Sequence, residues 1–361
     1  MQLNTTLRRS RICVAVISGI TACAAAWAEP DVLERPAQIQ ATARSTTSAL
    51  LAVGQAGPRL VTVGERGLSL WSDDQGKSWQ QAQVPVSVTL TSVSFTTATT
   101  GWAVGHSGTI LRTDDAGRTW MKMLDGKQVA ALISEAAKEP GADPQFIANA
   151  ERLVKDGPDK PFLDVRFIDE NHGLVVGAYG LILETSDGGK QWRSKQQHVD
   201  NPQGLHLYGI LYTESAIWLA GEQGSLFVSR NGGESYQPVA TPYEGTYFGI
   251  VATGKNLVVY GMRGNAYWSD DQGATWEKCE IPGNTNLTAA ASAGDGSLLL
   301  TDDGGNVYAS KNNGKLFVRA AHLKLGPLSG LLEVADGQFL FVGTRGVHRA
   351  APFKPATENK L

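Results

Sequence analysis

Short runs in which apolar and polar residues alternate recur along this chain, each about as long as a β-strand. Residues 90–95, 101–105 and 109–113 alternate with a period of two, which predicts three consecutive strands, and a fourth begins at Trp120. The same arrangement returns about every 40 residues. Four antiparallel strands repeated at this spacing indicate one blade of a β-propeller per repeat.

A motif of the form Ser/Thr-x-Asp/Asn-x-Gly-x-x-aromatic, called the box below, lies between the third and fourth expected strands of six repeats. We expect side-chain oxygens of its first and third residues to accept backbone N–H groups across a tight turn. Its glycine is expected to adopt a positive φ angle, and its aromatic residue to pack on the blade. The third and last residues are Asp74 and Trp79, Asp115 and Trp120, Asp187 and Trp192, Asn231 and Tyr236, Asp271 and Trp276, and Asn312 and Phe317.

A second motif, Gly-x-x-Gly, begins eight residues before each box and predicts a tight hairpin turn between the second and third strands, with glycine supplying the unusual φ angles. Its first positions are residues 64, 105, 177, 221, 261, 302 and 343, with Asp302 replacing glycine in the sixth repeat. The intervals are 41, 72, 44, 40, 41 and 41 residues, so seven repeats are present and one carries an insertion. The sequence therefore predicts an all-β, seven-bladed propeller.

The seventh repeat has no box and ends after three expected strands, within residues 326–353. Residues 37–45 precede the first repeat and alternate like a strand, so we expect them to form the outer strand of blade 7 and close the ring.

The insertion, at about residues 129–160, has a helical pattern. Apolar residues at 129, 132, 133, 136 and 137 predict one helix. Asp143 as N-cap followed by Pro144 predicts a second helix, which ends at Gly157. The insertion is therefore expected to be a helical hairpin between blades 2 and 3.

Residues 1–28 have the pattern of an export signal, which leaves residues 29–353 for the propeller and 354–361 as a C-terminal tail. Arginines precede an apolar stretch at residues 12–22, and Ala26-Trp27-Ala28 is a candidate cleavage site. The alternative is that Ile20-Thr21-Ala22-Cys23 is a lipobox that leads to acylation of Cys23. Both interpretations predict an exported protein, in the periplasm or another extracytoplasmic compartment.

Composition and charge narrow the class of partner. The formal net charge of −3 becomes −6 when the three arginines of the signal are removed, which argues against nucleic acid as a partner. After signal removal no apolar run of about 18 residues or more remains to span a membrane. Cleavage after Ala28 would also leave Cys279 as the one cysteine, so we expect no intramolecular disulfide.

No metal, cofactor or catalytic residue is expected from the motifs. A calcium loop needs roughly six to eight oxygen ligands including a bidentate carboxylate, and no such run follows the acidic boxes. The chain has no Gly-x-Ser-x-Gly elbow, no His-Glu-x-x-His and no Cys/His metal-binding spacing. The boxes are therefore interpreted as structural turns.

The Gly-x-x-Gly turns and the insertion are expected on one face of the propeller, because both lie on the side of the connections between blades. We call this side the Gly-x-x-Gly face. Tyr179 and His106 are candidate partner-binding residues there. Arginine recurs at the middle of these turns in blades 1, 5 and 7, as Arg66, Arg263 and Arg345. Clustered guanidinium groups on an acidic chain favour a partner with carboxylate or phosphate groups. The alternative interpretation is that these arginines are solvated turn residues paired with Glu65 or Glu222.

Segments 101–120 and 173–192, the latter including Asp187-Gly188-Gly189, resemble the photosystem II stability/assembly factor family of cyanobacteria and plant chloroplasts. The resemblance covers nearly all of the mature chain. It implies an exported or lumenal seven-bladed propeller with box repeats and an insertion near blades 2 and 3. In that family an arginine patch on one face is thought to bind an assembling membrane protein, and by repeat phase the three arginines above correspond to it. The implied partner is a membrane protein or envelope complex.

Similar boxes also occur in sialidases and other propeller glycoside hydrolases, which is the alternative function. A sialidase combines arginines for the substrate carboxylate with a tyrosine nucleophile and acidic partners. The three arginines are compatible with this, but the Arg-Ile-Pro motif of sialidases is absent near the N-terminus. The sequence therefore favours a non-enzymatic binding platform.

Overall fold

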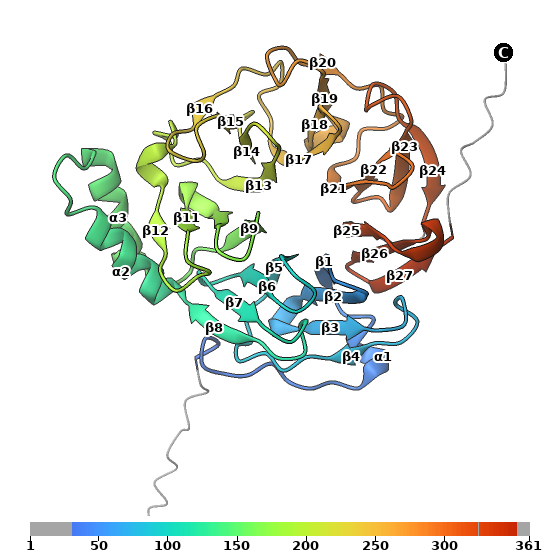
Figure 1. The fold of residues 1–361 in the computed structure, drawn as a ribbon, viewed down its shortest axis with the longest axis horizontal. Helices are drawn as coiled ribbons and strands as arrows, with labels where there is room; N and C mark the ends of the chain where they lie inside the picture. The colour runs from blue at the N-terminus through green and yellow to red at the C-terminus, as the bar shows by residue number, and fades with distance from the viewer. Residues whose placement is uncertain (1–30, 324, 352–361) are drawn as a thin grey trace, which may run out of the picture. The chain divides into compact units, whose positions relative to one another are not determined.

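The computed structural model describes residues 31–323 and 325–351, which form seven antiparallel sheets arranged as blades around a central channel (Figure 1). Six sheets have four strands and the last has three, and within each sheet the strands follow chain order. The prediction of a seven-bladed propeller is confirmed. The predictions for residues 1–28, for Cys23 and for the tail at 354–361 lie outside the described residues.

The strands of each blade run outward from the channel in the order of the chain (Figure 1). Blade 1 contains β1 (Leu50–Ala56), β2 (Arg59–Gly64), β3 (Ser69–Ser72) and β4 (Gln80–Gln81), and blade 2 contains β5 (Leu90–Phe95), β6 (Gly101–Gly105), β7 (Ile110–Thr113) and β8 (Met121–Leu124). Blade 3 contains β9 (Phe162–Phe167), β10 (Gly173–Gly177), β11 (Ile182–Thr185) and β12 (Arg193–Ser194), and blade 4 contains β13 (Leu207–Tyr212), β14 (Ile217–Gly221), β15 (Leu226–Ser229) and β16 (Gln237–Pro238). Blade 5 contains β17 (Tyr247–Thr253), β18 (Asn256–Gly261), β19 (Ala266–Ser269) and β20 (Glu277–Lys278), and blade 6 contains β21 (Leu287–Ser292), β22 (Leu298–Asp302), β23 (Asn306–Ser310) and β24 (Val318–His322). Blade 7 contains β25 (Leu328–Glu333), β26 (Phe339–Gly343) and β27 (Gly346–Ala350).

The boxes form the turns expected from their sequence. In the first box the Asp74 carboxylate accepts the backbone N–H groups of Lys77 and Ser78 at 3.0 and 2.9 Å, and the Ser78 hydroxyl at 2.6 Å. The Ser72 hydroxyl oxygen accepts the N–H of Gly76 at 2.8 Å. Equivalent bonds recur in the other five boxes, with an asparagine oxygen replacing the carboxylate in the fourth and sixth. The box glycines have φ angles of 77–90°, a region that an L-residue seldom adopts.

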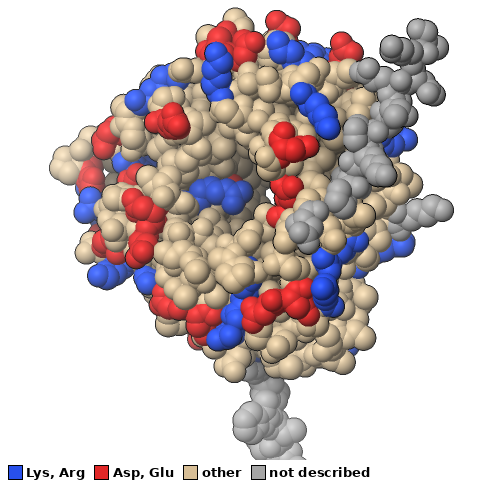
Figure 2. Space-filling model, turned by 45° about the vertical axis from the view of Figure 1, so that its right-hand side comes forward, with Lys and Arg blue, Asp and Glu red and all other residues tan. Residues whose placement is uncertain are grey.

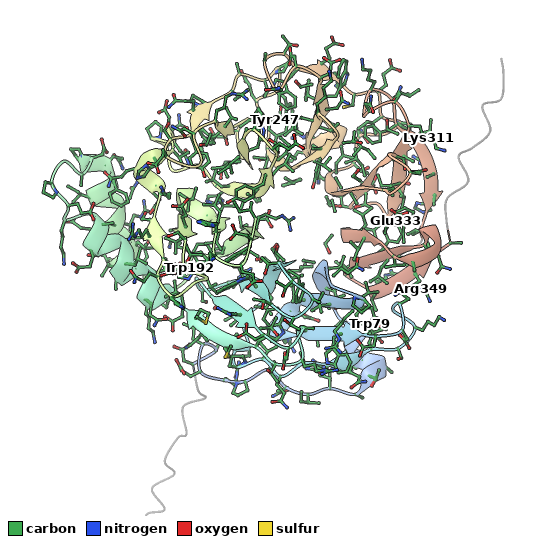
Figure 3. The ribbon with its side chains drawn as sticks, in the orientation of Figure 1. Trp79, Trp192, Tyr247, Lys311, Glu333 and Arg349 are labelled. Carbon is green, nitrogen blue, oxygen red and sulfur yellow. The ribbon has the colours of Figure 1, made fainter. Side chains whose placement is uncertain are left out.

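The aromatic residue of each box packs at the junction with the preceding blade. Trp192 of blade 3 meets Trp102 of blade 2 edge to face, with ring centroids 5.9 Å apart. Trp79 of blade 1 belongs to the same apolar cluster as Leu340 of blade 7, and Figure 3 shows Trp79 near Arg349 of that blade. All six aromatic residues are at most 8 % exposed. Each box therefore shapes its own turn and also joins two blades.

The path of the N-terminal segment differs from the prediction. Residues 37–45 do not pair with β27, and among the described residues no strand covers its outer edge. The segment instead follows the outside of blade 1, where Gln40 N–H donates to the Gln81 side chain at 2.9 Å, and it ends in a helical turn, α1 (Thr42–Ser45). Hydroxyl groups of Ser45 and Thr46 donate to the carbonyl of Thr42 at 3.0 and 2.9 Å, which favours this turn over an extended strand.

Blades 7 and 1 are joined by packing and by a few single hydrogen bonds. The Ser329 hydroxyl donates to the carbonyl of Leu50 at 2.7 Å, and Val347 N–H donates to the carbonyl of Thr46 at 3.1 Å. We call this junction the seam.

The insertion is a helical hairpin, as predicted, made of α2 (Gly126–Ala136) and α3 (Pro144–Asp156). Asp143 caps α3 and Gly157 ends it, whereas α2 begins three residues before the expected start. Its cap is Asp125, which accepts the N–H of Gln128 while the Gln128 side chain accepts the N–H of Asp125, a reciprocal pattern that the sequence analysis missed. No helix of the described part is long and apolar enough to cross a membrane.

Candidate functional site

The Gly-x-x-Gly turns of blades 1–5 each hold their second middle residue in the same backbone conformation, which Arg345 of blade 7 does not adopt. Arg66, Tyr179 and Arg263 have φ angles of 54°, 56° and 56°, so the second middle residue of the turn is left-handed. The first glycine is extended at Gly64, and a Cβ there would lie 2.1 Å from the carbonyl oxygen of Ala49. The prediction that glycine supplies the unusual φ is therefore correct for the second glycine only, and the first allows two backbones to approach closely.

Arg66, Arg263 and Arg345 are exposed on the Gly-x-x-Gly face of blades 1, 5 and 7. Among the described residues, none of their guanidinium groups forms an ion pair or hydrogen bond. Glu65 instead accepts the N–H of Ala49 at 3.2 Å, and Glu222 lies 3.2 Å from the ring of His206. Neither acid therefore pairs with the arginines in the structure, which are exposed turn residues.

The three arginines do not converge on one pocket. None of them lines the central channel, and Arg263 borders a separate hollow of about 570 Å³ together with Tyr243 and Glu244. Blades 7 and 1 are neighbours, so Arg345 and Arg66 lie on adjacent blades. His106 is exposed on blade 2.

Tyr179 begins a row of aromatic side chains that leads toward the channel. Its ring, 52 % exposed, lies under the Lys160 ammonium group at 5.0 Å and meets the His206 ring edge to face at 4.9 Å. His206 is followed by Tyr208 at 6.3 Å, and Tyr208 by Phe248 at 5.6 Å. Burial and then the Glu222 carboxylate raise the pKa of Tyr208. The row therefore extends from blade 3 across blades 4 and 5.

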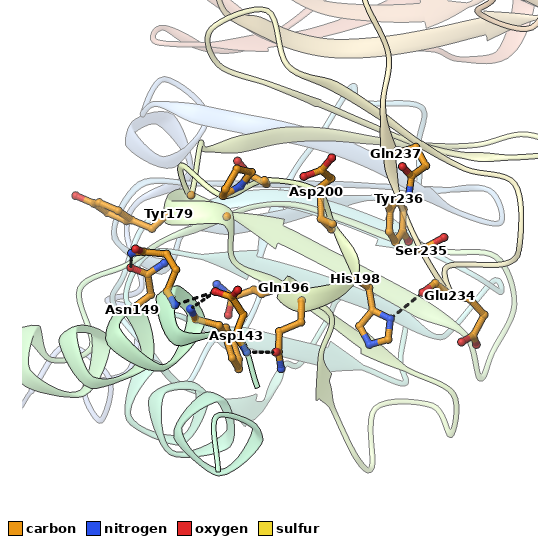
Figure 4. Close-up of a pocket in the computed structure, with 18 of the residues that line it drawn as sticks. Asp143, Asn149, Tyr179, Gln196, His198, Asp200, Glu234, Ser235, Tyr236 and Gln237 are labelled. Carbon is orange, nitrogen blue, oxygen red and sulfur yellow. Dashed lines mark hydrogen bonds between the residues drawn. The ribbon is translucent and has the colours of Figure 1, made fainter. Parts of the chain in front are cut away.

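The helical insertion borders a second cavity, of about 580 Å³, which Figure 4 shows in close-up. The N-terminal part of α3 contributes Asp143 and Asn149, and the connection from blade 3 to blade 4 contributes His198 and Asp200. Asp143 N–H donates to the Gln197 side chain at 3.0 Å, which ties the insertion to this connection. The insertion follows β8, and Gly126 N–H donates to the carbonyl of Ser107 in the Gly-x-x-Gly turn of blade 2 at 2.7 Å. It packs against β12 and so widens this face at one side.

The central channel forms a cavity of about 240 Å³ lined by the inner strands of the blades. Its two charged lining residues, Asp164 and Arg166, both belong to β9. Figure 2 shows basic side-chain surface inside the central opening, surrounded mostly by uncharged residues. Arg166 belongs to none of the repeat motifs, and the signal for it in the sequence is an arginine within the apolar run at residues 162–167.

Asp164 connects three blades from within the wall of the channel. Its carboxylate accepts the Ser92 hydroxyl of blade 2 at 2.7 Å, and the N–H groups of Val165 and Ile210 at 2.9 and 3.0 Å, the latter in blade 4. The residue is 6 % exposed. A buried carboxylate with three donors is well solvated by the protein, so Asp164 is a structural acceptor.

The part of the sequence that the structure describes contains no group of three or more His, Cys, Asp or Glu side chains able to hold a metal ion. The box carboxylates are held by their own turns, and the pKa of Asp74 is lowered mainly by the hydroxyl and N–H of Ser78. Cys279 is buried, which raises the pKa of its thiol far above the usual range and makes it unreactive.

Comparison with known proteins gives the family. The model of the family described as photosynthesis system II assembly factor YCF48 matches residues 60–134 and 148–279. The photosystem II assembly lipoprotein Ycf48 of Synechococcus sp. (strain CC9902) is 29 % identical over 156 residues, which is 42 % of this chain and 47 % of that protein. The match thus spans about half the length of this relative. The photosystem II assembly protein Ycf48 of Synechococcus sp. (strain JA-3-3Ab) is 26 % identical over 271 residues, 68 % of this chain and 79 % of that protein.

Solved structures agree with the fold. A structure described as YCF48 bound to D1 peptide has a TM-score of 0.62 at 16 % identity and covers 89 % of this chain and 97 % of its own. YCF48 from Cyanidioschyzon merolae has a TM-score of 0.61 at 17 % identity, with coverages of 87 % and 97 %. The box repeats, the seven blades and the family match together show that this chain belongs to the YCF48 family of photosystem II assembly factors.

Proposed function

We propose that this protein is an exported, non-enzymatic platform that binds a membrane protein during assembly of its complex. The observation that carries the proposal is the set of three exposed arginines without an ion pair among the described residues, all on the Gly-x-x-Gly face. Free guanidinium groups in a water-exposed turn favour carboxylates of a partner through paired hydrogen bonds. A relative of the same fold is described as bound to a D1 peptide, so peptide recognition occurs on this scaffold.

The alternative function, glycoside hydrolysis, receives no support from the arrangement of the arginines. A sialidase-type site needs its arginines around one substrate carboxylate. Here the arginines lie on turns of three blades, and the central cavity is lined by Arg166 instead. Membership of an assembly-factor family also favours binding over catalysis.

Charge reversal tests the docking face. We expect the tagged wild-type protein to capture a membrane protein from detergent-solubilised envelope, identified by mass spectrometry and then confirmed with the purified partner. Changing Arg66, Arg263 and Arg345 together to glutamate should abolish capture. The matched control changes three exposed lysines of box turns on the opposite face, Lys77, Lys190 and Lys311, and should leave capture intact. Equal capture by both variants would overturn the docking face.

Export and anchoring are part of the same proposal. Relatives are named assembly lipoproteins, which supports acylation of Cys23 over cleavage after Ala28. The mass of the mature N-terminus distinguishes acylation of Cys23 from cleavage after Ala28. Acylation gives a chain that begins at Cys23 and carries added lipid. A Cys23→Ser variant should lose that mass and leave the membrane fraction, and an unprocessed wild-type N-terminus would contradict export by either route.

A further inference from the structure

The side chain of Arg166 extends from β9 at the wall of the central cavity and is 46 % exposed. Among the described residues its guanidinium makes no hydrogen bond, and its nearest acidic group is Asp164, 3.7 Å away. That carboxylate is already occupied by three donors. Since arginine stays charged and carries five N–H donors, most of its hydrogen-bonding capacity remains available to a ligand.

The lining around Arg166 combines a few apolar side chains with polar groups, several of which are already paired. Leu51, Leu163, Tyr208 and Phe248 present hydrocarbon and ring surface. The lining hydroxyls are used by the blades themselves, as the Thr91 hydroxyl donates to the carbonyl of Phe162 at 2.8 Å. Hydroxyls of Ser329 and Thr288 likewise donate to backbone carbonyls. A ligand therefore meets one cationic group, the rings of Tyr208 and Phe248, and a largely polar wall of backbone and hydroxyl groups.

Size and charge define the class of ligand. A volume of about 240 Å³ is that of roughly eight water molecules, which suits a small ligand group. Arg166 is the one cationic group of the lining and the Asp164 carboxylate lies 3.7 Å from it, so the site holds too little positive charge for a phosphate dianion. Burial raises the pKa values of Tyr208 and Tyr260, which line the same cavity, so both phenols stay neutral there.

The aromatic row gives the direction of approach. Tyr208 and Phe248 are the second residues of their strands, at the end nearest the Gly-x-x-Gly face, whereas Arg166 is the fifth residue of β9. Because all inner strands run the same way around the ring, Arg166 lies about 10 Å further along the channel. A ligand that enters from this face passes the aromatic rings before its charge reaches the guanidinium.

From these observations we infer that the central channel contains a carboxylate-binding site centred on Arg166, for a monocarboxylate that carries one apolar side chain. Two sources have this chemistry: a small organic acid, and the C-terminal residue of another polypeptide. The site is separate from the docking arginines, which do not line the cavity.

Isothermal titration with N-acetyl-L-leucine tests the site, with N-acetyl-L-leucinamide as the uncharged probe. We expect the acid to bind the wild-type protein and the amide not to bind. Arg166→Gln should weaken binding about tenfold or more, the effect of losing a charge-assisted pair. Arg193→Gln, an exposed arginine on the outer strand of the same blade, is the matched control and should bind like the wild type.

A hexapeptide that ends in leucine distinguishes the two sources, because the C-terminal residues of a polypeptide also contact the aromatic row. If the peptide binds more tightly than N-acetyl-L-leucine, and the same peptide with a C-terminal amide does not bind, the site takes the end of a polypeptide. If the peptide and N-acetyl-L-leucine bind equally, the site takes a small acid. Failure of both acids to bind, or equal binding to Arg166→Gln, would overturn the site. Should Arg166→Gln not fold, Arg166→Lys keeps the charge without the planar fork and should show a smaller loss. Glutamate variants of the three docking arginines should bind the acid normally, so the two proposals fail independently.

Discussion

Replacing Asp164 with alanine should weaken the propeller at the junctions of blade 3 with both of its neighbours. The change removes the acceptor of the Ser92 hydroxyl and the Ile210 N–H, which come from blades 2 and 4. A buried donor left without a partner costs about 1–3 kcal/mol, so two donors cost about 4 kcal/mol together. At roughly 2 °C per kcal/mol for a domain of this size, the midpoint of thermal unfolding should fall by about 8 °C.

Urea unfolding followed by circular dichroism measures this loss, and a double-mutant cycle with Ser92→Ala assigns it. The two substitutions should be coupled by about 1–3 kcal/mol, because both remove the same 2.7 Å bond. Glu170→Ala is the matched control, an exposed acid of the same blade, and should change stability by less than about 0.5 kcal/mol. A loss below about 1 kcal/mol for Asp164→Ala, or no coupling with Ser92, would show that channel water replaces the carboxylate and would refute the reasoning.

Three further predictions concern acid, the boxes and the insertion. Hydrogen bonds from the Thr275 hydroxyl and N–H lower the pKa of Asp271 in the folded protein to about 2, below the ordinary value of about 3.9. The Asp271 carboxylate therefore contributes its full stabilisation above about pH 4, and this contribution is lost as the pH falls toward 2. Asp271→Asn should therefore flatten the acid dependence of the urea midpoint, and an unchanged slope would contradict this. Gly189→Ala should lower the free energy of unfolding in urea by about 3 kcal/mol, because the φ of Gly189 is 77° and a Cβ there would lie 2.1 Å from a tryptophan ring of blade 2. The control Gly232→Ala, with open space around the glycine, should cost about 1 kcal/mol. Equal losses would exclude the steric explanation. Phe146→Ala should lower the free energy of unfolding in urea by about 3–4 kcal/mol, because Phe146 is buried in the core. The control Ile147→Ala changes an exposed neighbour and should cost less than about 1 kcal/mol. Equal small losses would show that α3 does not share the core.

The number and order of the blades could be predicted from the sequence because each box is a local structure. Its hydrogen bonds join residues at most four positions apart, so the motif and its spacing determine the turn wherever it occurs. The helix ends around Asp143 and Gly157 were predictable for the same reason, since capping acts within one turn.

Features that depend on distant segments were not predictable. The alternation of residues 37–45 suits a strand, but hydroxyls that bond back along the backbone and the outer surface of blade 1 determine its path. The channel site brings together Arg166, Tyr208 and Phe248 from three strands, and no spacing along the sequence reports their distance across the ring. The exposed arginines were found because they share one turn position, whereas their lack of ion pairs required the structure.

The seam has a mechanical consequence for the whole ring. At every other junction the polypeptide itself continues from one blade into the next, so those blades stay tethered even when their packing is disturbed. Blades 7 and 1 are held by side-chain packing and a few hydrogen bonds, and no sheet is shared across them in the described residues. They can part without breaking a covalent bond or a continuous strand ladder. The seam is therefore the one junction between blades at which the described ring has no covalent continuity.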